Sequence, residues 1–134
     1  MAAAHERGPA FAVEARWQRL FLALEWMSAR TGGTTTRGTL GLVVAARAEP
    51  RLRRLYPFTS HATLCLSSCT RYPYAIAVPP VEPLHDGRFR VRVPRSRDVI
   101  GVTDTAEEAI ALVLDHLPAD IGPAVAGTAG DLGP

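Results

Sequence analysis

The sequence contains neither lysine nor asparagine, so all fifteen of its basic residues are arginine. A GC-rich coding bias accounts for this composition. The absence of lysine has a chemical consequence that does not depend on its origin. Without a side-chain amine, the protein can neither form a Schiff base with a carbonyl substrate nor use a lysine as general base. These two classes of amine catalysis are therefore excluded.

Long apolar runs are also missing. The longest, Leu20–Leu24 and Leu40–Ala46, fall far short of the ~20 residues that cross a bilayer. The N-terminal residues MAAAHERGP lack the basic-then-apolar order of a signal peptide. A formal net charge of +2 is too small to indicate nucleic-acid binding. We therefore expect a cytoplasmic protein that binds neither membranes nor nucleic acid.

Cysteine is scarce, with only Cys65 and Cys69 present. If both lie on one extended strand, their Cα atoms are about 13 Å apart. A disulfide requires less than about 7 Å. We therefore expect two reduced thiols, as is usual in the cytoplasm. Two cysteines without a nearby pair of histidines do not form a zinc site, so no metal site is expected.

A chain of 134 residues is long enough for one domain with one hydrophobic core. We expect residues 1–8 to be disordered and residues 9–118 to form a single α+β domain. Residues 119–134 are rich in glycine, alanine and proline, and we expect them to form an extended tail.

Three segments have helical patterns. Apolar residues recur at three- and four-residue steps from Ala10 to Arg30, which predicts an amphipathic helix. A second helix is expected from about Arg37 to Ala48, although Gly38 and Gly41 weaken this prediction. The third follows a capping box, in which Asp104 or Thr105 precedes Glu107 or Glu108, and it ends at Pro118.

Between the second and third helices, alternating patterns predict four strands. These strands are Ser60–Cys69, Tyr74–Val78, Arg88–Val93 and Val99–Val102. Short connections favour an antiparallel meander with the N-terminal helices and the one C-terminal helix packed on one face. Such a sheet has a modest core, so a homodimer that partly buries the other face is expected.

The central segment Leu55–Tyr74 holds four of the nine aromatic residues, both cysteines and His61. His61 is either a hydrogen-bonded sheet residue or a group that transfers protons, and we select it as the candidate catalytic residue. On the third strand, Arg90 and Arg92 point away from Phe89 and Val91. They form either a solvated face or a surface for an anionic ligand.

Five stretches are similar to a family of small actinobacterial proteins often encoded beside natural-product gene clusters. These stretches are LYPFTSHATL, CTRYPY, LHDGRFRV, DTAEEAIALVLDHLP and GPAVAGTAGDL, and the similarity extends over about Ala48–Leu132. Within this group, the chain resembles the lysinoalanine-forming enzymes of cinnamycin and duramycin type lanthipeptide clusters. The resemblance implies addition of a substrate lysine amine to a dehydroalanine in a ribosomally made precursor peptide. It also implies that no cofactor or metal is required and that a hydroxyaspartate of the peptide acts as base.

This chemistry requires donors for the oxygen that becomes negatively charged and a surface that fixes the peptide. Seven residues are candidates for substrate binding. Arg71, Arg90 and Arg92 can bind a carboxylate or an oxyanion, and Tyr56, Thr59, Tyr72 and Tyr74 can supply aromatic walls and hydroxyl donors. Two alternatives remain, a non-catalytic peptide-binding or immunity protein of such a cluster and a small-molecule cyclase. The cyclase would need an enclosed apolar pocket.

Overall fold

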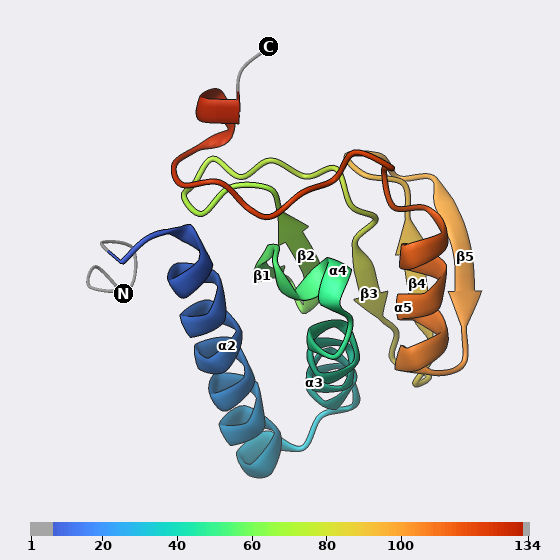
Figure 1. Cartoon of the computed structure of the whole chain (residues 1–134). Helices are drawn as coiled ribbons and strands as arrows, with labels where there is room; N and C mark the ends of the chain where they lie inside the picture. The colour runs from blue at the N-terminus through green and yellow to red at the C-terminus, as the bar shows by residue number, and fades with distance from the viewer. Residues whose placement is uncertain (1–6, 133–134) are drawn as a thin grey trace.

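The computed structural model describes residues 7–132, so most of the segment predicted to be disordered, and the last two residues of the tail, lie outside it. The fold is α+β. Five strands form one antiparallel sheet in the order β1-β2-β3-β4-β5, and the helices lie together on one face (Figure 1). The predicted meander with helices on one face is confirmed.

The strands differ from the prediction in number and in bounds. They are β1 Tyr56–Ser60, β2 Thr63–Ser67, β3 Val81–Pro83, β4 Phe89–Arg92 and β5 Val99–Thr103. β4 and β5 lie close to where the alternation placed them. In β4, Phe89 and Val91 are buried against the helices, while Arg90 and Arg92 lie on the other face. The alternation of apolar and charged residues was therefore sufficient to predict which side chains of this strand face the core.

The predicted strand Ser60–Cys69 is confirmed only over Thr63–Ser67, which is β2, because its first residues form a hairpin turn. His61 and Ala62 have φ of 50° and 71°, the left-handed values of a two-residue hairpin loop. Tyr56 and Pro57 open the preceding strand, β1, which was not predicted as a separate strand. Tyr74–Val78 is not a strand either. It belongs to an irregular connection that ends at β3.

The helices are α2 Pro9–Thr31, α3 Thr34–Arg47, α4 Pro50–Arg53 and α5 Ala106–Asp115, with a final short helix η1 Ala129–Leu132. The capping box of α5 is confirmed. Thr105 Oγ1 accepts a hydrogen bond from Glu108 N at 3.1 Å and donates to Glu108 Oε1 at 3.0 Å. Gly32 ends α2 in the left-handed conformation, with φ 64°.

Gly38 lies inside α3, where sequence reasoning treated it as a weakness of the helix. The structure gives the reason for its presence. A Cβ at Gly38 would lie 2.8 Å from Cβ of Pro83, because α3 crosses directly over β3. The residue that lowers helix propensity therefore permits the close approach of helix and sheet.

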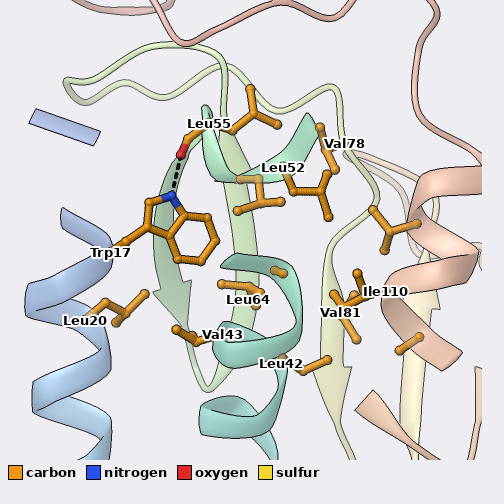
Figure 2. Packing of buried hydrophobic residues seen from close by; sticks show 14 of the residues in the cluster. Trp17, Leu20, Leu42, Val43, Leu52, Leu55, Leu64, Val78, Val81 and Ile110 are labelled. Carbon is orange, nitrogen blue, oxygen red and sulfur yellow. Dashed lines mark hydrogen bonds between the residues drawn. The ribbon is translucent and has the colours of Figure 1, made fainter. Parts of the chain in front are cut away.

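The core fills the space between the sheet and the helices. Trp17 of α2 is fully buried, and its indole Nε1 donates to the carbonyl of Leu55 at 3.1 Å (Figure 2). It also donates to the carbonyl of Arg53 at 2.8 Å. Leu42 and Val43 of α3 belong to the same buried cluster as this ring. A single indole thus ties α2 to the segment that leads into β1.

The C-terminal segment was predicted to be an extended tail, and residues 119–132 do run across one end of the molecule (Figure 1). This segment is bound to the connection that follows β2. Val125 forms a parallel bridge with Cys69, and Arg71 N donates to the carbonyl of Gly127 at 2.7 Å. The tail therefore holds the loop that carries Tyr72 and Tyr74.

Candidate functional site

The face of the sheet opposite the helices, called here the open face, carries the candidate site. Strand register identifies its residues, since paired residues of an antiparallel sheet lie on the same side. Leu64 pairs with Val81, and Val81 pairs with Val91, all three buried beneath the helices. Their neighbours Cys65, Glu82 and the two arginines of β4 therefore point to the open face.

Aromatic side chains gather at the β1 edge of this face. We call Tyr56, Phe58, Tyr72 and Tyr74 the aromatic cluster. The rings of Phe58 and Tyr74 stack with centroids 4.4 Å apart, and Tyr72 meets Tyr74 edge-on at 5.9 Å. Tyr72 is 81% exposed, whereas Tyr56 is buried. Within the cluster, Tyr72 is therefore exposed to solvent while one edge of its contact surface packs against Tyr74.

Glu82 binds both arginines of β4. Its Oε1 accepts hydrogen bonds from Arg90 Nη2 at 2.8 Å and from Arg92 Nη2 at 3.2 Å. Partial burial alone would raise the Glu82 pKa, but the hydrogen bonds from Arg90 and Arg92 outweigh it and hold the pKa below its ordinary value. The two guanidiniums therefore share one internal carboxylate before any ligand is present.

This arrangement predicts a pH-dependent contribution to stability. At neutral pH, Glu82→Gln should lower the free energy of unfolding by about 1 kcal/mol. Because the folded-state pKa lies below the unfolded value, the contribution is complete above the unfolded pKa and is lost as the pH falls through the folded-state pKa. Urea denaturation over a pH series measures it, with Glu25→Gln, an exposed carboxylate on α2, as control. A difference that does not change with pH would contradict this origin.

A hollow of about 450 Å³ lies between β2 and the connection from β4 to β5. Cys65 and Ile76 contribute to it from one side, and Arg95 and Arg97 from the other. Burial raises the pKa of the Cys65 thiol to about 11. Arg95 and Arg97 form no ion pair with any other residue of the part 7–132. The hollow therefore combines an uncharged thiol with two guanidiniums that are available to an anion.

The structure brings some of the predicted site residues together and separates others. Tyr56, Tyr72 and Tyr74 join the aromatic cluster, and Arg71 is exposed in the same loop. Arg90 and Arg92 lie on the open face, as predicted, but bind Glu82. Their role as ligands of a substrate carboxylate stays a prediction.

Two predicted site residues lie elsewhere. Thr59 pairs with Leu64, which places it on the helix side of the sheet. His61 is exposed at the tip of the β1–β2 hairpin, not within a strand. It lies outside both strands of the hairpin, three residues beyond Phe58, and takes no part in the ring contacts of the cluster. The structure therefore does not bring His61 to the aromatic cluster.

Sequence reasoning missed four residues that line or stabilise the open face. They are Phe58, Glu82, Arg95 and Arg97. The available signal for Phe58 was alternation, which is clear only after the hairpin turn at His61 has been recognised. Glu82 lies in β3, a strand too short to show a pattern. Arg95 and Arg97 lie in a loop, where no periodicity applies.

Within residues 7–132, no three histidine, cysteine, aspartate or glutamate side chains come together as a possible metal site. In the same part of the chain, no helix combines the length and the apolar character needed to cross a membrane.

Comparison with known proteins gives a family but no activity. The chain matches the model of the family of unknown function DUF6193 over residues 11–128. No curated protein and no solved structure matches it. The matched range includes every strand of the sheet, the helices α3 to α5 and the loop that carries Tyr72 and Tyr74. The chain therefore belongs to the DUF6193 family.

Proposed function

We propose that this protein binds a ribosomally made precursor peptide on its open face and closes a lysinoalanine bridge in it. The observation that carries the proposal is the hollow at Cys65, which is flanked by two unpaired guanidiniums. None of the residues that line the hollow is a carboxylate or a histidine. This lining suits a reaction in which the peptide supplies its own base.

The reaction forms one bond between the lysine nitrogen and the β-carbon of dehydroalanine. The π electrons of the alkene move to the carbonyl oxygen, and the amine proton passes to the hydroxyaspartate carboxylate of the peptide. The carboxyl group then returns this proton to the α-carbon as the electron pair on oxygen re-forms the carbonyl, which completes the addition. Every atom of the substrate is retained, so the product has the mass of the starting peptide.

The positive charges beside the hollow favour both deprotonation of the lysine amine and formation of the oxyanion. A free lysine amine has a pKa near 10.4, so it must lose a proton before it attacks. Guanidiniums such as Arg95 and Arg97 disfavour a second positive charge nearby and thereby lower that pKa. The same groups stabilise the negative charge that develops on the carbonyl oxygen. The protein's contribution is orientation and electrostatics.

The competing nucleophile on this face is Cys65, since a thiolate adds readily to dehydroalanine. Its raised pKa, about 11, keeps the sulfur protonated at neutral pH. Cys69 is fully buried, so it does not reach a bound peptide. Together with the absence of lysine, this leaves the amine of the substrate as the reactive nucleophile at the site.

The proposal is tested by incubating the protein with a thioether-bridged precursor peptide that contains dehydroalanine and hydroxyaspartate. Because ring closure leaves the mass unchanged, the readout is the mass added when the products are treated with a small thiol. We expect the alkene to become unreactive toward the thiol. Ile76→Arg, which fills the hollow with a third guanidinium, should leave it reactive. If the alkene remains thiol-reactive with the wild-type protein, catalysis is excluded.

The same face also fits a non-catalytic carrier or immunity protein, because a surface without a general base is sufficient for binding. Such a protein would bind the peptide and leave the alkene reactive toward the thiol. The assay therefore separates the two functions when peptide binding is measured alongside it.

Tyr72 should contribute to the affinity for the peptide. It is 81% exposed, so Tyr72→Ala removes a contact surface without opening the core. We expect the dissociation constant of the precursor to rise by roughly tenfold or more, as for aromatic residues at interfaces. Isothermal titration calorimetry measures this effect, and His61→Ala at the hairpin tip is the control. If His61→Ala lowers affinity or turnover and Tyr72→Ala does not, His61 belongs to the site and Tyr72 does not.

A further inference from the structure

A second cavity lies on the other side of the molecule, at one end of the helical layer. Its volume is about 380 Å³, and it lies between the start of α2, α4 and the C-terminal segment at Pro123. This volume falls within the roughly 300–1,000 Å³ of small-molecule sites. No strand residue lines it, so it is separate from the hollow at Cys65.

The walls of this cavity are apolar. Three prolines and three small aliphatic side chains form them, namely Pro9, Pro50, Pro123, Ala10, Val13 and Ala124. Prolines at these positions give rigid walls, since each ring fixes its own backbone φ. A cavity of this kind accepts a compact apolar group without reorganisation of the chain.

The charged side chains around the cavity are not balanced. Arg53 forms a two-point ion pair with Glu14, with Nε–Oε1 at 2.8 Å and Nη2–Oε2 at 3.1 Å, so these two charges cancel. Arg54 has no carboxylate partner within residues 7–132. Its Nη2 donates to the carbonyl of Ile121 at 2.7 Å, while its buried Nε–H has no acceptor.

Arg54 lines this apolar cavity, and a half-buried guanidinium without a carboxylate partner in residues 7–132 favours an anion. We propose that this cavity binds a carboxylate attached to a compact apolar body, with Arg54 as the binding residue. A free aliphatic acid has this chemistry, and so does the C-terminal carboxylate of a peptide that ends in an apolar residue. The proposal does not depend on the reaction at the open face.

Octanoate titrated into the full-length protein tests the proposal, with the nitrogen-bound proton of Arg54 Nε followed by NMR. We expect a saturable shift of this signal and of the amides of Ala10, Val13 and Ala124. Octanamide, which lacks the charge, should bind roughly tenfold or more weakly. A short peptide ending in leucine, titrated as free acid and as amide, shows whether the natural carboxylate is a peptide C-terminus or a small acid. Tighter binding of its acid form than of octanoate indicates a peptide terminus, and the reverse indicates a small acid.

Two variants locate the site. Ala10→Trp, at an exposed position of the first turn of α2, should fill the cavity and abolish octanoate binding while the fold is kept. Arg51→Gln, also exposed on α4 but outside the cavity lining, should leave binding unchanged. If octanoate does not move the Arg54 signal, or if Ala10→Trp leaves its affinity unchanged, the proposal is wrong.

Discussion

Trp17→Ala should lower the free energy of unfolding by about 3–5 kcal/mol, the cost of emptying a large buried site. Trp17 is fully buried, and it links α2 to two carbonyls in the segment that enters β1. The substitution therefore creates a cavity and also removes the donor to both carbonyls. A loss of this size is a large part of the stability of a small domain. Chemical denaturation followed by circular dichroism measures it.

The chain supplies a matched control in its other tryptophan. Trp26 lies on the outer side of α2 and is 62% exposed. Trp26→Ala should change the free energy of unfolding by less than about 0.5 kcal/mol, as is usual for surface substitutions. Equal losses in the two variants would show that the orientation of α2 differs from the one described.

Cys65 should react with iodoacetamide about 100-fold more slowly at neutral pH than a cysteine of ordinary pKa, because only the thiolate attacks. Its pKa of about 11 arises from the burial of its side chain, which lies on β2 beside the loop residues of the hollow. The rate should therefore keep rising with pH, by roughly tenfold per unit, between about pH 7 and pH 10. Peptide mapping by mass spectrometry separates alkylation of Cys65 from that of the buried Cys69.

The pH profile also distinguishes a raised pKa of the Cys65 thiol from steric shielding of a thiol with an ordinary pKa. If the thiol had an ordinary pKa and were only covered, its slow rate would level off near about pH 9. Such a plateau would mean that a thiolate is present on the open face near neutral pH. A bound dehydroalanine would then meet a competing nucleophile, which would count against ring closure at this site.

The parts of the fold that follow from local pattern could be predicted from the sequence. The capping box at Thr105 and Glu108 placed α5, and alternation in Phe89–Arg92 oriented β4. Other features depend on tertiary contacts or on strands too short to show a pattern. Gly38 lowers helix propensity, but it is required by the contact of α3 with Pro83. β3 contains Pro83 at its end and pairs through only a few residues, so it carries almost no signal of its own.

The candidate site was predictable only in part, and the reason is the hairpin turn. Two residues without glycine, His61 and Ala62, adopt left-handed conformations there. Turn chemistry normally marks such a position with asparagine or glycine, and the chain contains no asparagine. The turn was therefore not recognised, so His61 was placed within a strand. The three tyrosines do come together, because the loop that carries Tyr72 and Tyr74 packs against Tyr56 of β1.

The central claim is that a precursor peptide lies on the open face of the sheet, across the hollow at Cys65. Isotope-labelled protein titrated with dehydroalanine-bearing precursor peptide tests it most directly, through the backbone amide signals. The account predicts shifts at Tyr72–Tyr74, at Cys65 and along residues 95–97, with little change in α2 and α4. Shifts confined to the helical side of the sheet, or no shifts at saturating peptide, would contradict it.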